Sequence, residues 1–367
     1  MNICIIGGGN MGTALAAYFY ESYNDVVIYS KNAEKFCRSI EAIDIISDEK
    51  IIAEVFATND LSKAVSTADI ICITYPSFML QEIFDDIAPL LRADTIVGVI
   101  PGTGGVEFFS KPLKNNTVFG LDRVPCVARI KEYGKAVYHS KKKSVRVAAL
   151  PSSQTQKVCE VLNDMLDFEF SPLNNYLTLT FTPSNPTLHT SRTYTMFKDY
   201  VNGDFYDRKF LFYKEWTMDA SEMLHGMDME IHDTCDALDG IDLSGVIPIL
   251  THYESETPKQ MTDKIRSIKS LSQIVSPMKE VDGGFIPDFS SRFFIEDFPY
   301  GLMILKGFAQ IAGIKTPNMD KVIRWHGERL GQNYIDENGE ILQDNDSITP
   351  QKYGINTVQD VYDFYLS

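Results

Sequence analysis

The chain has 367 residues, of which 44% are hydrophobic and 23% charged, as expected for a globular protein large enough for two domains. Its formal net charge of −16 disfavours a nucleic acid or an anionic membrane surface as a partner, because both would be repelled. No apolar run is long enough to span a bilayer, and the N-terminus shows no signal peptide. The six cysteines are scattered and include no CxxC pair, which indicates reduced thiols in a cytoplasm, with neither a disulfide framework nor a metal site.

The first half of the chain alternates continuous apolar strands with helices. We expect strands at 2–6, 25–30, 51–57, 69–74, 95–100, 116–121, 126–132, 144–150 and 168–171. Helices are expected between them at 11–20, 32–40, 60–66, 77–92 and 153–166. This alternation predicts an α/β fold with a doubly wound parallel sheet covered on both faces, which is a Rossmann-type domain.

The character of the sequence changes near residue 180. Strand signals nearly vanish, and helical patterns follow at 186–200, 206–238, 258–272, 299–313 and 317–331. We therefore predict a dinucleotide-binding domain over residues 1–180 and a mainly α-helical substrate and catalytic domain over residues 181–367. The active site is expected in the cleft between them.

The clearest local motif is a G-x-G-x-x-G sequence between the first strand and the first helix. Gly7 permits the tight turn, Gly9 lets the backbone approach a pyrophosphate, and Gly12 lets the helix pack on the strand. The pyrophosphate would then lie at the helix N-terminus, beside Asn10 and Met11. The alternative is a glycine turn that binds nothing.

The choice of cofactor is usually set at the end of the second strand, where NAD enzymes carry an acidic residue. Here Ser30 and Lys31 stand at that position, and Asp25 lies at the opposite end. This pattern favours NADP(H) over NAD, although Lys31 could simply be a solvated lysine. Tyr75 and Pro76 follow a later strand and are expected to line the cofactor, because ligands bind at the carboxyl ends of such strands.

The second half carries the candidate proton-transfer groups. His189 lies near the domain junction, where a structural histidine is the default interpretation. The histidines in or beside the later helical patterns are expected at the surface or at helix ends; these are His225, His232, His252 and His326. Arg292, Glu296 and Asp297 precede a helix that opens near residue 299, and the carboxylates there could merely cap it.

Together, these segments resemble the octopine/nopaline (opine) dehydrogenase family across nearly the whole chain. Four segments carry the resemblance: the glycine loop, Arg-Val-Pro-Cys-Val-Ala-Arg at 123–129, Asn185-Pro186-x-x-His189, and Arg292-x-x-x-Glu296-Asp297-x-Pro299-Tyr300-Gly301-Leu302.

The resemblance implies a reductive condensation of an amino acid with a 2-oxo acid such as pyruvate. It assigns His189 as general acid and base, Asp297 as the group that orients His189, and Arg292 as the ligand of the amino-acid carboxylate. Arg192, one helical turn from His189, could assist in binding a carboxylate. No metal is implied, and a homodimer would fit.

Three alternatives stay open. The first is a simple 2-oxo acid or 2-hydroxy acid dehydrogenase of the ketopantoate reductase or glycerol-3-phosphate dehydrogenase type, although those enzymes usually rely on a lysine in the helical domain. The second is a non-catalytic NADP(H)-sensing protein. The third is a related enzyme that acts on a larger metallophore precursor, because pocket shape cannot be read from sequence.

Overall fold

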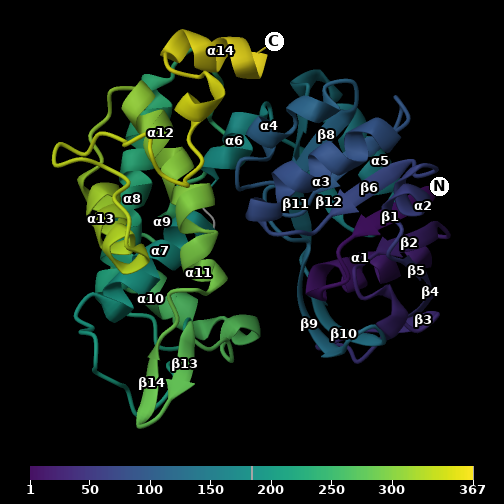
Figure 1. The fold of residues 1–367 in the computed structure, drawn as a ribbon, viewed down its shortest axis with the longest axis horizontal. Helices are drawn as coiled ribbons and strands as arrows, with labels where there is room; N and C mark the ends of the chain where they lie inside the picture. The colour runs from purple at the N-terminus through teal and green to yellow at the C-terminus, as the bar shows by residue number, and fades with distance from the viewer. Residues whose placement is uncertain (183–184, 367) are drawn as a thin grey trace. The chain divides into compact units, whose positions relative to one another are not determined.

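The computed structural model describes residues 1–182 and 185–366. Pro183, Ser184 and Ser367 belong to the predicted second domain but lie outside the described residues. The chain divides into two compact units, Met1–Thr180 and Phe181–Leu366 (Figure 1). The first is an α/β unit and the second is mainly helical, so the predicted fold class is confirmed.

The first unit is built on a sheet that, within the described residues, has eight strands in the order β12-β11-β8-β7-β6-β1-β2-β5. Its strands are β1 (Asn2–Ile6), β2 (Asp25–Tyr29), β5 (Phe56–Thr58), β6 (Ile70–Ile73), β7 (Ile96–Val99), β8 (Thr117–Leu121), β11 (Ser144–Leu150) and β12 (Glu169–Pro172). Neighbours are parallel except for β8 and β11. The carboxyl ends of β1, β2 and β6 therefore share one edge, where a Rossmann sheet binds its ligand.

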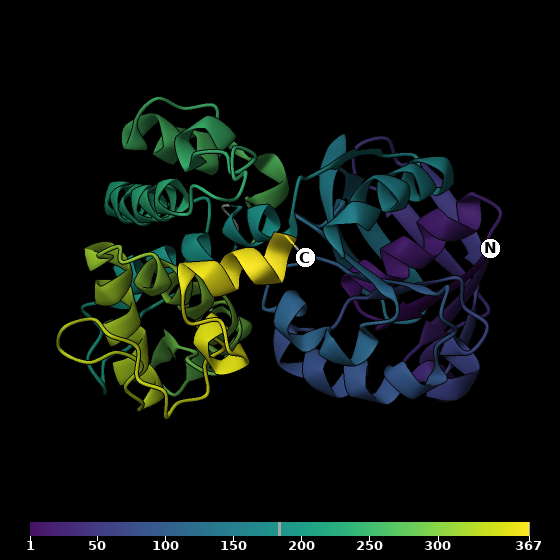
Figure 2. The same ribbon diagram turned by 90° about the horizontal axis from the view of Figure 1, so that it is seen from above.

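Helices cover both faces of this sheet, as Figure 2 shows from above. One face carries α2 (Leu61–Val65), α3 (Leu80–Ile87) and α4 (Val106–Phe109), which contact one another. The other carries α1 (Asn10–Glu21) and α5 (Thr155–Met165), whose apolar side chains share one buried cluster with the sheet.

A second sheet packs on α1 and was not expected. Its strands are β3 (Ser39–Asp44), β4 (Lys50–Glu54), β9 (Cys126–Glu132) and β10 (Ala136–Lys141), in the order β4-β3-β10-β9. The predicted helix at 32–40 is wrong, because only one short turn forms there before β3 begins. Ile40 and Ala42 alternate into the core with the period of a strand, and that burial decides the structure.

The second unit packs its helices around a separate apolar core. The elements are α7 (Asn185–Phe197), α8 (Met218–Ala237), α9 (Ile249–His252), α10 (Pro258–Ser267), α11 (Arg292–Ile295), a π-helical turn (Phe298–Leu302), α12 (Met303–Ile311), α13 (Pro317–Leu330) and α14 (Val358–Leu366), with a hairpin of β13 (Met278–Val281) and β14 (Gly284–Pro287). α6 (Tyr176–Phe181) joins the two units along the chain. The predicted helix over 206–238 is correct only from Met218, since residues 207–217 form an irregular loop.

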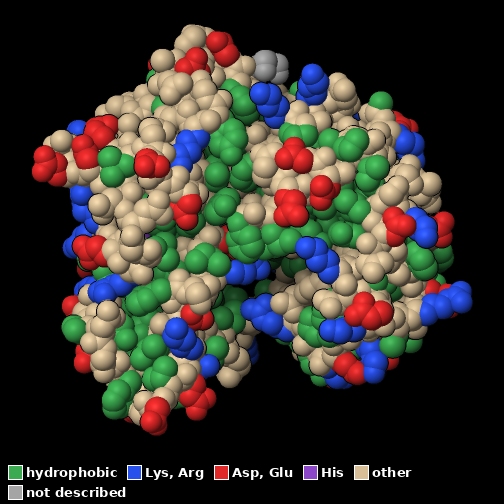
Figure 3. Space-filling model, in the orientation of Figure 1, with side chains coloured by type: hydrophobic (Ala, Val, Ile, Leu, Met, Phe, Trp, Pro, Cys, Tyr) green, Lys and Arg blue, Asp and Glu red, His purple; other side chains and the backbone are tan. Residues whose placement is uncertain are grey.

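Charged side chains of both signs are interspersed over the face of each unit that Figure 3 shows, so the negative charge is not gathered there in one patch. In residues 1–182 and 185–366, no helix combines the length and the apolar character needed to cross a membrane.

Candidate active site

The glycine loop between β1 and α1 leaves the first turn of α1 open. Gly7 has a φ of +116°, which side chains rarely adopt, and a Cβ on Gly12 would stand 1.8 Å from the Gly7 carbonyl oxygen. A Cβ on Gly9, the N-cap of α1, would meet no atom within 4 Å. The first turn of α1 also carries no acidic side chain. Its N–H groups therefore fit a pyrophosphate, the central group of a dinucleotide.

Asn10 and Met11 fasten this loop to the second sheet. Asn10 Oδ1 accepts a hydrogen bond of 2.7 Å from the Ile130 N–H, and Met11 Sδ lies 3.9 Å from Cys126 Sγ. The Cys126 contact links the 123–129 segment to the glycine loop. Both side chains support the loop, while their backbone N–H groups belong to the open first turn of α1.

Ser30 and Lys31 follow β2, at the same edge of the sheet. Ser30 is buried, and its Oγ lies 3.2 Å from the Tyr133 hydroxyl and accepts a hydrogen bond from the Asn32 N–H. Lys31 is exposed, and Asp25 begins the strand at its far end. Lys31 thus brings positive charge to this edge of the sheet, and the buried Ser30 holds Asn32 and Tyr133 beside it. No sequence pattern pointed to Tyr133.

The loop after β6 reaches the glycine loop. The Thr74 hydroxyl donates to the Ile6 carbonyl at 3.2 Å, and the Tyr75 ring lies 3.3 Å from the place of a Gly7 Cβ. Burial raises the pKa of Tyr75 to about 12, so its phenol stays neutral. Pro76 follows directly, at the start of the turn into α3. The predicted cofactor residues of the first unit therefore lie along one edge.

His189 is the centre of a second group of residues, in the helical unit. Its Nδ1 lies 2.8 Å from Asp297 Oδ2, and its Nε2 lies 2.9 Å from the Tyr213 hydroxyl. Phe293 and Phe212 cover the ring, with centroids 4.5 Å and 5.4 Å away. The Asp297 carboxylate accepts a hydrogen bond from the Nδ1–H, which leaves Nε2 facing Tyr213. An imidazole held in this way can gain and lose a proton at Nε2, as general acid–base chemistry requires.

Two close approaches bring His189 and Asp297 together. Helices α7 and α11 lie side by side, and Gly301 in the π-helical turn packs directly on Pro186 at the start of α7. The turn follows Asp297 immediately, and the Leu302 N–H bonds to the Asp297 carbonyl five residues back. Such π turns are frequent at functional sites, because they redirect a helix locally.

Arg292 is the first residue of α11 and lies five residues before Asp297. Its side chain is exposed, and its Nε donates to a Glu296 carboxylate oxygen. Among the described residues, this is the one hydrogen bond of the guanidinium, so both Nη groups can still grip a carboxylate in the bidentate way. Glu296, at 13% side-chain exposure, fixes the direction of the guanidinium.

Arg192 has a different role from the one expected. The side chain is buried; its Nε donates to the Phe212 carbonyl, Nη1 to Thr217 Oγ1 and Nη2 to the Glu215 carbonyl. Its guanidinium also stacks on Trp216. These bonds engage Nε, Nη1 and Nη2 with the 207–217 loop that carries Tyr213, so Arg192 positions that loop.

His326 corrects a further expectation, because it is fully buried and is not at the surface. Its Nδ1 donates to the Val322 carbonyl at 2.9 Å, and Nε2 lies 3.1 Å from Thr193 Oγ1. The ring stacks on Phe298 at 5.1 Å. His326 thus ties α13 to α7 and to the π-helical turn.

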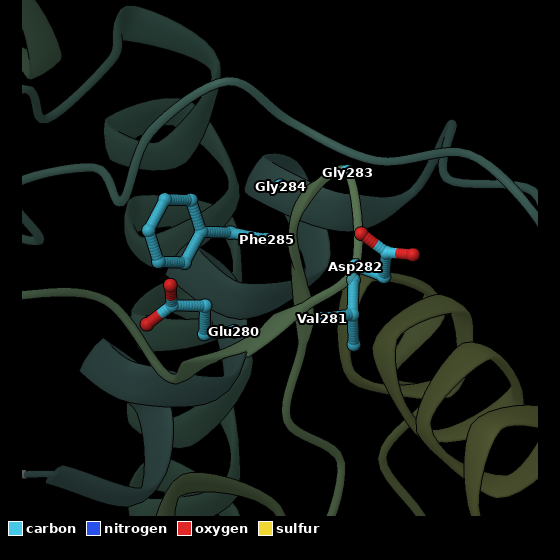
Figure 4. Close-up of a pocket in the computed structure, with 6 residues that line it drawn as sticks. All are labelled: Glu280, Val281, Asp282, Gly283, Gly284 and Phe285. Atoms are coloured by element: carbon cyan, nitrogen blue, oxygen red, sulfur yellow. The ribbon is translucent and has the colours of Figure 1, made fainter.

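A surface pocket in the helical unit contains none of these residues. The tip of the β13–β14 hairpin lines it, with Glu280, Val281, Asp282, Gly283, Gly284 and Phe285 (Figure 4). Glu280 and Phe285 pair across the hairpin and project to one side, while Asp282 points away. Within the described part of the chain, no group of three or more His, Cys, Asp or Glu side chains is arranged to hold a metal.

The chain matches two protein families over separate ranges. Residues 172–330 match the family described as NAD/NADP octopine/nopaline dehydrogenase, alpha-helical domain. Residues 2–111 match the family described as NAD-dependent glycerol-3-phosphate dehydrogenase N-terminus.

Several relatives align with nearly the whole chain. Tauropine dehydrogenase of Arabella iricolor is 29% identical over 397 aligned residues, which cover 98% of this chain and 99% of the relative. Opine dehydrogenase of Haliotis discus hannai is 29% identical and covers 98% of this chain and 97% of its own. A solved octopine dehydrogenase with NADH and L-arginine shares the fold, with a TM-score of 0.85 at 24% identity over 98% of this chain and 97% of that one.

Proposed function

Because this chain belongs to the octopine/nopaline (opine) dehydrogenase family, we propose that it is an NAD(P)H-dependent oxidoreductase that condenses an amino acid with a 2-oxo acid and reduces the product. The product would be a secondary amine that carries two carboxylates. The observation that carries the proposal is the His189–Asp297 pair at 2.8 Å, with Arg292 five residues before Asp297 in the chain.

The first unit would hold the dinucleotide. The open first turn of α1 would receive the pyrophosphate, and Tyr75 would lie beside it. When bound, the reduced nicotinamide supplies the hydride.

The helical unit would handle the substrates. The Nη groups of Arg292 would grip the amino-acid carboxylate and thereby orient the amine. His189 would supply the proton that lets the carbinolamine lose water, and would take one back in the reverse reaction. Asp297 would keep Nδ1 protonated and stabilise the imidazolium through its negative charge.

The test is cofactor oxidation by the purified protein with pyruvate, with and without a mixed amino-acid pool, followed by the mass of the product. We expect oxidation only when both substrates are present, and a product mass that contains both. Oxidation with pyruvate alone would favour a simple 2-oxo acid reductase. Cofactor binding without turnover on a panel of 2-oxo acids would favour a sensor.

A pair of histidine variants tests the candidate catalytic residue. His189→Gln should lower the rate about 10²–10⁴-fold. The control is His252→Gln, which changes a histidine elsewhere in the helical unit and should leave the rate unchanged.

We propose further that NADPH is preferred over NADH. The support is that Lys31 is exposed two residues after the end of β2, near the position that recognises the ribose in such folds, while the acidic Asp25 is at the far end of the strand. Lys31→Ala should raise the KM for NADPH roughly tenfold, about 1.4 kcal/mol, and leave that for NADH unchanged. Lys35→Ala removes a nearby exposed lysine and is the matched control. An equal effect on both cofactors would contradict the proposal.

Two further properties belong to the same proposal. The free thiols of all six cysteines, five of them buried, support a cytoplasmic location. Exposed apolar side chains of the helical unit, among them Phe205 and Val201, support a homodimer through that unit. Sedimentation of the purified protein would test the dimer.

A further inference from the structure

Tyr213 occupies the one position from which His189 can exchange a proton. Asp297 takes Nδ1, and the rings of Phe212 and Phe293 pack against the imidazole. The remaining ring nitrogen, Nε2, lies 2.9 Å from the Tyr213 hydroxyl, and both side chains are buried. A proton that leaves Nε2 in this arrangement therefore passes first to the Tyr213 oxygen.

The loop that carries Tyr213 is braced from two sides. Arg192 donates to the carbonyls of Phe212 and Glu215, on either side of Tyr213 along the chain. Arg266, from α10, donates to the Trp216 carbonyl at 2.6 Å. The Tyr213 ring also stacks on Trp216, with the ring planes 11° apart. Two buried or partly buried arginines thus fix an irregular loop, and its phenol, in place against His189.

A phenol suits the position because its oxygen accepts one hydrogen bond while its O–H donates another. We propose that Tyr213 relays the proton between His189 Nε2 and the substrate oxygen; this inference rests on the proposed function and adds a catalytic residue to it.

In the condensation, the Tyr213 O–H donates its proton to the carbinolamine hydroxyl. The C–O bond breaks, and its electron pair leaves with the oxygen as water. The nitrogen lone pair forms the C=N bond of an iminium ion. His189 Nε2–H reprotonates the Tyr213 oxygen, so the imidazolium becomes neutral as the substrate becomes positive. In the reverse reaction the same protons move the other way.

The deciding variant is Tyr213→Phe, which keeps the ring and its stacking and removes the hydroxyl. Tyr194→Phe is the matched control, since Tyr194 is a buried tyrosine on α7 that packs on Trp325 and does not contact His189. The readouts are kcat, the KM for each substrate, the Kd for NADPH, and kcat in mixtures of light and heavy water. Circular dichroism and the NADPH Kd establish that the variants are folded.

For Tyr213→Phe, we expect kcat to fall at least 100-fold, with each KM and the NADPH Kd within threefold of wild type. The dependence of wild-type kcat on the deuterium fraction should be curved, which indicates two protons in flight, and should become linear in the variant. A kcat within threefold of the Tyr194→Phe value would overturn the relay. So would a linear dependence in the wild type, even if kcat falls, because Tyr213 would then only orient the ring. Failure of the wild type to condense any substrate pair would instead overturn the proposed function.

Discussion

Gly301 and Pro186 touch so closely that a Cβ on the glycine would stand 2.4 Å from the Pro186 Cγ. This contact joins the π-helical turn after Asp297 to the first turn of α7. His189 lies three residues after Pro186 on the same helix, and its Nδ1 faces the Asp297 carboxylate. The absence of a side chain at position 301 therefore sets the distance between the two candidate catalytic groups.

Gly301→Ala should separate α7 from the turn and lengthen the His189–Asp297 bond. We expect a loss of about 1–3 kcal/mol in unfolding free energy from overpacking, together with a lower kcat. Urea unfolding and steady-state kinetics measure the two effects. Combining the change with Pro186→Gly should cost less than the sum of the single variants, because the clash is shared between the two positions. If the unfolding free energies of the two single variants simply added, the Gly301–Pro186 contact would not be what sets the His189–Asp297 distance.

Asp297→Asn should abolish most activity without unfolding the protein. An amide can still bond to His189 Nδ1, but it neither fixes the proton there nor stabilises the imidazolium. We expect kcat to fall about 10²–10⁴-fold, with unchanged NADPH binding. Asp282→Asn, at the exposed hairpin tip of Figure 4, is the control and should behave as wild type. If Asp282→Asn were the damaging change, the hairpin pocket would replace His189 as the candidate site.

Those features that the sequence predicted are encoded locally. The glycine loop of residues 7–12 can be recognised from its own segment, because Gly7 adopts the positive φ of the turn and a Cβ on Gly12 would collide with the Gly7 carbonyl oxygen. His189 and Asp297 were predicted from their sequence motifs. The motif of His189 includes Pro186 and that of Asp297 includes Gly301, and these two residues pack on each other in the structure.

The features that were missed depend on distant contacts. Residues 207–217 have the composition of a helix, but Arg192 and Arg266 hold them as a loop, and that loop alone brings Tyr213 to His189. Likewise, β3 is a strand because it pairs with β10, far along the chain. His326 lies within a helical pattern that does not say which face is buried.

Arg292→Lys should weaken amino-acid binding more than it slows turnover. Lysine keeps the positive charge but loses the planar fork that grips a carboxylate bidentately. We expect the amino-acid KM to rise roughly 10–100-fold, equivalent to about 1.5–3 kcal/mol, with the 2-oxo acid KM less affected. Arg324→Lys, an exposed arginine on α13, provides the matched control. A fall in kcat at unchanged KM would assign Arg292 to the transition state and not to substrate binding.

Glu296→Gln tests the partner of Arg292. Loss of the carboxylate removes a competitor for the guanidinium but also the group that directs it. Because Arg292 is exposed and its Nη groups are the proposed grip, we expect the directing effect to dominate and the amino-acid KM to rise a few-fold, about 0.5–1 kcal/mol. A lower KM would show that Glu296 holds Arg292 back from the substrate.

Burial lowers the pKa of His326 to about 4, against the opposing effect of its bond to the Val322 carbonyl. The unfolded chain binds this proton near pH 6.5 and the folded chain does not, so the stabilisation is complete above pH 6.5 and is lost as the pH falls toward 4. The shift corresponds to about 3 kcal/mol.

His326→Leu removes the titrating group. Between pH 7 and pH 4, the unfolding free energy of this variant should therefore fall by about 3 kcal/mol less than that of the wild type. Urea unfolding at both pH values gives the comparison, and only the difference in pH dependence counts, because the leucine also changes packing against Phe298. Equal pH dependence in the two proteins would mean that His326 takes up its proton in the folded state as readily as in the unfolded one.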